Sequence, residues 1–114
     1  MDINVASKEF IDAEDALRRI GGNEELYKRL LSRFIDGNYV GALDDAIEKG
    51  DVEESVRLAH TLKGVSANLS LVKIRSISTE LEQMIKDGAD YSAGLAELRQ
   101  VYGETITKIA EVMK

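Results

Sequence analysis

The sequence predicts an all-α protein, an antiparallel up-down four-helix bundle with a short extra helix at the N-terminus. Apolar residues recur at spacings of three and four along almost the whole chain. Glycine followed by Asn or Asp separates the apolar segments, as at helix ends and starts. No segment alternates with a period of two for long enough to form a strand. We expect a single domain over residues 1–114.

The first two helices are predicted from their start signals. Asp12 followed by Asp15 resembles a capping box, which favours a short helix that ends at Gly21-Gly22. Asn23 can then cap the next helix. The apolar face of that helix is formed by Leu26, Leu30 and Phe34.

The stretch DGNYVG, residues 36–41, has the least distinct boundary signal, because its glycines and Asn fit either a turn or a bend. We interpret it as the junction between two helices. The helix that follows has Val40, Leu43 and Ile47 on its apolar face. Short connections of two to six residues make successive helices antiparallel, which predicts the up-down order of the bundle.

Two further boundaries define the C-terminal half. Gly50-Asp51, with Glu54 at capping-box spacing, starts a helix over about residues 52–68, and Gly88-Ala89-Asp90 separates the last two helices. The apolar positions of these two helices are Ile74, Ile77, Leu81 and Met84, then Leu95, Leu98, Tyr102, Thr105, Ile109 and Val112.

Composition excludes several classes of function. The chain has no Cys, which removes disulfides, thiolate nucleophiles and cysteine metal ligands. A net charge of −6 with interspersed cations argues against nucleic-acid binding. No apolar run is long enough for a membrane span, and the N-terminus lacks a signal region. We therefore expect a cytoplasmic protein. By default we also expect a monomer, with neither a metal nor a cofactor.

The segment AHTLKGVSANLS, residues 59–70, contains the only histidine and an unexpected glycine within a helix. Helical spacing places Leu58, Leu62, Val65 and Leu69 on the core side. The opposite, outward side carries His60, Lys63, Gly64, Val56 and Ala67. A helical glycine costs about 1 kcal/mol relative to Ala. Gly64 therefore serves either the packing of a neighbouring helix or the approach of a partner, and both explanations remain open.

One imidazole and one ammonium group support only limited chemistry. Neither Ser55 nor Ser66 lies at a spacing that would pair it with His60 in a hydrolytic triad, and no metal-ligand cluster accompanies the histidine. A neutral imidazole can nevertheless act alone as a nucleophile and accept a phosphoryl group. Lys63, one turn away, could neutralise phosphoryl oxygens. Such a site needs a second protein to supply the remaining groups.

HTLKG, followed by small residues and Asn-Leu, resembles the signature of histidine-containing phosphotransfer (HPt) domains. The upstream GGNEELYKRLLSRF and KGDVEESVRLAHTLKG and the downstream Leu81-Glu82 match the family layout, so the resemblance spans about residues 11–112. It implies a helical bundle in which His60 accepts the phosphoryl group on Nε2. Lys63 would be the cationic neighbour, and Gly64 would let a receiver domain approach.

The resemblance also implies a role. The chain would carry a phosphoryl group between aspartates of response-regulator receiver domains, one of which could belong to a hybrid sensor histidine kinase. The receiver would bring the divalent cation, so the chain would be a carrier and not an enzyme. Two alternatives remain: a helical module that docks a receiver or kinase without being phosphorylated, and a fragment of a histidine kinase, although the chain has no glycine-rich nucleotide loop.

The sequence departs from the family at two positions after the motif. Members usually have a run such as SAGNLG, whereas this chain has VSANLS, with Ala67 and Ser70 in place of two glycines. Ala67 keeps the surface small, and we expect Ser70 to cap the following helix. The departures bear on the choice of partner.

Overall fold

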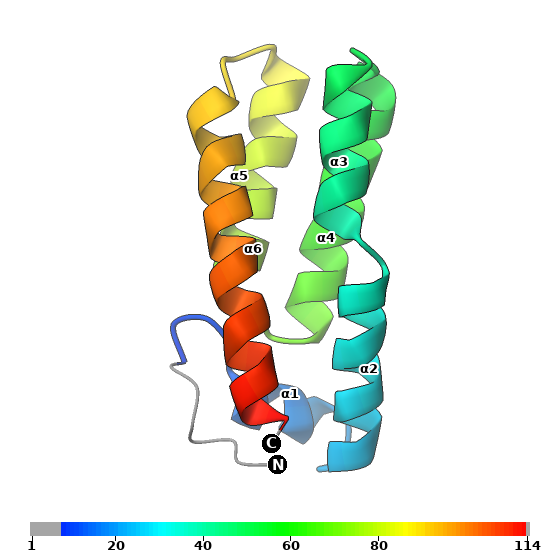
Figure 1. Ribbon diagram of the computed structural model, residues 1–114, viewed down its shortest axis with the longest axis vertical. Helices are drawn as coiled ribbons and strands as arrows, with labels where there is room; N and C mark the ends of the chain where they lie inside the picture. Colours follow the sequence, from blue (N-terminus) through cyan, green and yellow to red (C-terminus); the bar gives the residue numbers. More distant parts are fainter. Residues whose placement is uncertain (1–7, 114) are drawn as a thin grey trace.

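A computed structural model describes residues 8–113, and this part of the chain forms six helices and no strand. The helices are α1 (Ala13–Arg19), α2 (Glu24–Asp36), α3 (Tyr39–Glu48), α4 (Val52–Asn68), α5 (Val72–Asp87) and α6 (Ser92–Val112). They build the bundle that the sequence predicts: α4 packs against α3 and α5, and α6 packs against α5 and α3. The short α1 lies across the end of the bundle at which α4 meets α5 (Figure 1).

The start signals act largely as predicted. Asp12, Asn23 and Asp51 each accept a hydrogen bond from the backbone N–H three residues later, at 3.1, 3.0 and 3.1 Å. Gly50 and Gly88, which follow α3 and α5, have φ values of +72° and +69°, a conformation that glycine adopts without steric cost. These particular boundaries therefore follow from local sequence.

The DGNYVG stretch differs from the prediction, because it breaks the helix without reversing it. α2 and α3 follow one another along the same side of the bundle and together form one of its four columns (Figure 1). Asn38 takes a left-handed conformation at the break, and the Tyr39 ring stacks on Phe34 with centroids 5.6 Å apart. A Cβ on Gly37 would lie 2.6 Å from the Tyr39 ring, so glycine is required for this packing.

The buried face of α4 is turned slightly from the predicted one. Leu62 and Leu69 are buried as expected, but Leu58 and Val65 are only partly buried. Small side chains take their place at the centre of the contact, namely Ser55, Ala59 and Ser66. Small residues allow α4 to approach its neighbours closely, and this packing fixes the outward face that carries the histidine.

The prediction that Ser70 caps α5 is wrong. Leu71 occupies the cap position of α5, without a side-chain hydrogen bond to the helix. Ser70 instead has a φ of +56°, a left-handed conformation that glycine adopts more readily than other residues. Its hydroxyl donates to Asp15 Oδ2 of α1 at 2.8 Å. The serine therefore links the α4–α5 loop to α1.

Candidate functional site

His60 lies near the middle of α4 and faces outward, as the helical spacing predicts. Its side chain is 66% exposed. α5 packs against α4 beside this face, so the surroundings of the imidazole come from both helices. The ring is therefore accessible to a partner but is also within reach of side chains from α5.

Glu82 of α5 is the central group beneath the histidine. Both of its oxygens lie 3.2 Å from His60 Nδ1, and its side chain is only 8% exposed. Lys63 Nζ lies 3.1 Å from Glu82 Oε1, and Lys86 Nζ lies 3.0 Å from Glu82 Oε2. A single buried carboxylate thus holds three nitrogen-bearing side chains from two helices.

The charge of Glu82 is stabilised by these partners. Burial alone raises the pKa of the carboxyl, but hydrogen bonds from Lys86, Lys63 and His60 outweigh burial and lower the pKa to about 2. Glu82 is therefore ionised at neutral pH. An ionised carboxylate can only accept hydrogen bonds.

The ionised carboxylate fixes the tautomer of the histidine. Because Glu82 only accepts, His60 Nδ1 must carry the proton that it donates to Glu82. In the neutral ring the lone pair then lies on Nε2, the nitrogen that makes no hydrogen bond within residues 8–113. His60 thus presents an oriented nucleophilic nitrogen on an exposed surface.

Lys63 and Lys86 place two positive charges beside the imidazole. Their side chains are 34% and 50% exposed, so each ammonium group can turn from Glu82 toward a ligand. The predicted Lys63 is therefore joined by a second cation that the sequence reading did not identify. Two cations next to a nucleophile suit an anionic group that carries several oxygens, such as a phosphoryl group.

Gly64 is exposed, and a Cβ built on it would meet nothing within 4 Å. The packing of a neighbouring helix therefore does not require glycine at this position. The open surface leaves room for a partner at Gly64, and the approach of a partner stays a prediction.

The two remaining predicted contact residues flank the histidine at a distance along α4. Val56 and Ala67 are both half-buried. The Ala67 carbonyl accepts a hydrogen bond from Arg19 of α1 at 2.8 Å. Val56 precedes His60 by about one helical turn, and Ala67 follows it by about two turns.

Glu82 and Lys86 are the residues of the candidate site that sequence reasoning missed. Leu81-Glu82 matches the layout of the resembled family, and the spacing of Glu82 and Lys86 fits an ion pair across one helical turn. The missing information was the packing of α5 against α4, which alone places Glu82 under His60.

Within residues 8–113 the structure contains no cluster of His, Cys, Asp or Glu that could hold a metal ion.

Comparison with known proteins agrees with the resemblance. The family model of the Hpt domain matches residues 29–110, well over half of the chain. No match was found among curated proteins or among solved structures. Among the helices of residues 8–113, none is both long and apolar enough to span a membrane.

Proposed function

Because the chain belongs to the Hpt domain family, whose members take part in phosphorelay histidine phosphotransfer, we propose that it carries a phosphoryl group on His60 between receiver domains. The observation that carries this proposal is the pairing of His60 Nδ1 with buried Glu82, which leaves Nε2 free on the surface. One receiver aspartate would donate the group, and another would accept it.

The geometry supports a simple transfer step. The Nε2 lone pair attacks the phosphorus of an aspartyl phosphate, and the bond between phosphorus and the aspartate oxygen breaks with its electrons on the carboxylate. The Nδ1 proton stays on the ring, so the phosphorylated imidazole carries a positive charge that Glu82 balances. No proton has to leave the site. The reverse sequence of bond changes returns the phosphoryl group to an aspartate.

The neighbouring residues have distinct proposed roles. Lys63 and Lys86 stabilise the negative oxygens of the transferred group. Both ammonium groups form ion pairs with the carboxylate that contacts the imidazole, so they lie close to His60. Gly64 leaves room for the receiver, and Val56 and Ala67 contribute contact area to either side. The receiver supplies the divalent cation and the groups around its aspartate.

Within this proposal the chain acts as a monomeric cytoplasmic carrier, with a hybrid sensor histidine kinase as one source of the phosphoryl group. It has no kinase activity of its own. The alternative is a helical module that docks a receiver without being phosphorylated. The free Nε2 favours transfer over this alternative, because docking alone requires no oriented nucleophile.

The experiment that tests the proposal is incubation of the chain with a phosphorylated receiver. We expect a labelled chain whose phosphoryl group is labile to acid and stable to base, as for phosphohistidine. Addition of a second, unphosphorylated receiver should remove the label. A chain that binds the receiver and remains unlabelled would support the docking module instead.

Gly64 provides a separate prediction. We expect Gly64→Ala to raise the free energy of unfolding by about 1 kcal/mol, because Ala is the better helix former and its methyl group meets no atom. A longer side chain in Gly64→Gln should lower the rate of transfer from a receiver by about 10- to 100-fold, since a displacement of about 1 Å misplaces the reacting atoms. Urea unfolding and single-turnover transfer measure the two effects.

Gly103→Gln is the matched control for this substitution. Gly103 is also exposed within a long helix, and its added Cβ would also meet nothing within 4 Å. It lies on α6, which does not pack against α4 as α3 and α5 do. Equal transfer rates for the Gln variants of Gly64 and Gly103 would show that no partner approaches Gly64.

A further inference from the structure

A groove of about 620 Å³ lies beyond the end of the histidine helix. One wall is α1 with Asp15 and Arg19, the other is the first half of α5, and the α4–α5 loop lies between them. Ala67 of α4 also lines the groove. Since Ala67 is on the outward face that carries His60, the groove continues that face.

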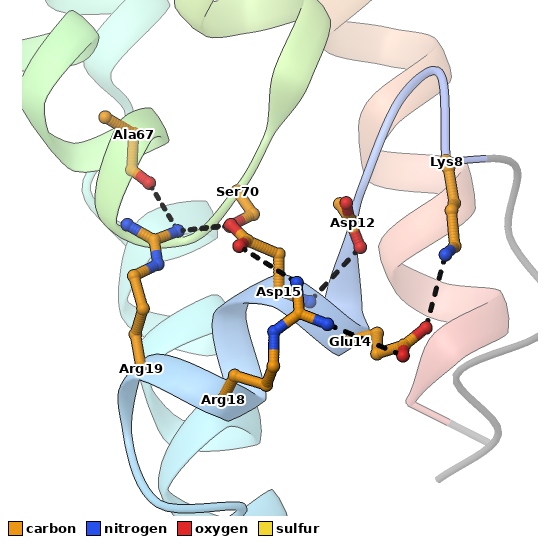
Figure 2. A network of polar contacts seen from close by, with 8 residues as sticks. All are labelled: Lys8, Asp12, Glu14, Asp15, Arg18, Arg19, Ala67 and Ser70. Atoms are coloured by element: carbon orange, nitrogen blue, oxygen red, sulfur yellow. Dashed lines mark hydrogen bonds and ion pairs between the residues drawn. The ribbon is translucent and has the colours of Figure 1, made fainter.

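A polar network holds the α1 wall in place (Figure 2). Arg19 donates to the Ala67 carbonyl at 2.8 Å and to the Ser70 hydroxyl, and it pairs with Asp15 at 3.1 Å. Ser70 in turn donates to Asp15 at 2.8 Å. The contacts of Ala67 and Ser70 with α1 join residues that are 48 to 55 positions apart in sequence, and they fix α1 against the end of α4. The groove is therefore a preformed feature of the surface.

The α5 wall carries two charges without a partner. The Arg75 guanidinium and the Glu80 carboxylate both line the groove and belong to exposed residues. Neither group makes a hydrogen bond or an ion pair within residues 8–113, whereas Arg19 and Asp15 neutralise one another. Unpaired charges beside a cavity are available to groups of opposite sign on a partner.

Distance places the groove within reach of a partner that docks on His60. Ala67 follows His60 by seven residues, which is about 10 Å along a helix that rises about 1.5 Å per residue. A protein interface of standard size covers about 800 Å² on each partner, or a patch about 30 Å across. A protein centred on His60 therefore covers the near end of the groove.

We propose that this groove recognises the receiver domain that exchanges phosphoryl groups with His60, and that Arg75 and Glu80 select among receivers by charge. The proposal rests on the proposed function. The receiver segment that enters the groove presents an acidic group to Arg75 and a basic group to Glu80. Receivers with the opposite arrangement bring like charges together and are rejected.

The test compares charge reversals in the full chain. We expect Arg75→Glu and Glu80→Lys each to lower kcat/KM for transfer from the preferred receiver by about tenfold, mainly through KM. Arg33→Glu, which reverses an exposed arginine of α2 outside the groove, should leave kcat/KM unchanged. Phosphoramidate, a small phosphoryl donor that needs no docking surface, should label all variants at the rate of the parent chain.

The possible results distinguish receiver recognition by the groove from phosphoryl transfer through His60, on which it rests. Equal kcat/KM values for the parent chain and both groove variants, across a set of receivers, would overturn the role of the groove and leave His60 as the acceptor. Failure of the parent chain to accept a phosphoryl group from any receiver and from phosphoramidate would overturn the proposed function, and the groove proposal with it.

Discussion

The His60→Gln variant will accept no measurable phosphoryl group from a phosphorylated receiver. Gln has a similar length but lacks a nucleophilic ring nitrogen, and Lys63 and Glu82 cannot take over the covalent step. The whole reaction depends on this atom, so the expected effect is complete loss and not a reduced rate. Transfer of radioactive phosphate, separated by gel under alkaline conditions, measures it.

The fold of this variant should remain intact, which separates chemistry from stability. The His60 side chain is 66% exposed, so its replacement should change the free energy of unfolding by no more than about 0.5 kcal/mol. Circular dichroism and urea unfolding provide this control. Labelling of a well-folded His60→Gln chain at the rate of the parent would place the acceptor elsewhere.

Replacement of Glu82 by Gln should lower the rate of phosphoryl uptake by about 10- to 100-fold, the range found when a carboxylate that orients a metal-binding imidazole is removed. The amide has nearly the same shape but no charge, and it can present either a donor or an acceptor to Nδ1. The amide therefore neither fixes the tautomer of His60 nor balances the positive charge of the phosphorylated ring. Both phosphoramidate and receivers should show the loss, because the defect lies in the nucleophile.

Glu104→Gln is the matched control for Glu82→Gln. Glu104 is an exposed residue of α6, a helix that packs against α5 and α3, and the same charge change there should leave uptake unchanged. If Glu82→Gln and Glu104→Gln both react at the parent rate, the carboxylate does not activate His60.

The same variant also tests the pKa of Glu82. The folded state lowers this pKa from 4.5 to about 2, so the stabilisation is complete above about pH 5 and is lost as the pH falls toward 2. Between pH 7 and pH 3 the parent chain should lose about 2 kcal/mol more unfolding free energy than Glu82→Gln. Urea unfolding at both pH values checks this, and parallel losses would show that the carboxyl titrates normally.

The parts of the fold that depend on local sequence could be predicted. Asp12, Asn23 and Asp51 cap their helices, and Gly50 and Gly88 lie in left-handed turns, because these preferences involve only residues within one helical turn. At DGNYVG the sequence predicts an ordinary junction between two antiparallel helices, which the structure does not have. Whether the chain reverses direction there depends on the contact between the Tyr39 and Phe34 rings, and this contact cannot be read from the sequence.

The parts of the site that depend on tertiary packing could not be predicted. Helical spacing placed His60, Lys63 and Gly64 on one outward face, and they do share it. Glu82 is buried because α5 packs against α4. Ser70 is held in place by a hydrogen bond from Arg19, which is 51 residues away in sequence. A pattern within one helix carries no information on which side chain of another helix lies opposite.

The most direct test of the proposed carrier role is a nitrogen and phosphorus NMR spectrum of the chain after transfer from a receiver. Labelling the imidazole with ¹⁵N allows both ring nitrogens to be observed. We expect phosphorus to be coupled to Nε2 of His60 and a proton to remain on Nδ1, where Glu82 accepts it. Phosphorus on Nδ1, or on any other residue, would contradict the role of Glu82 and of the exposed Nε2.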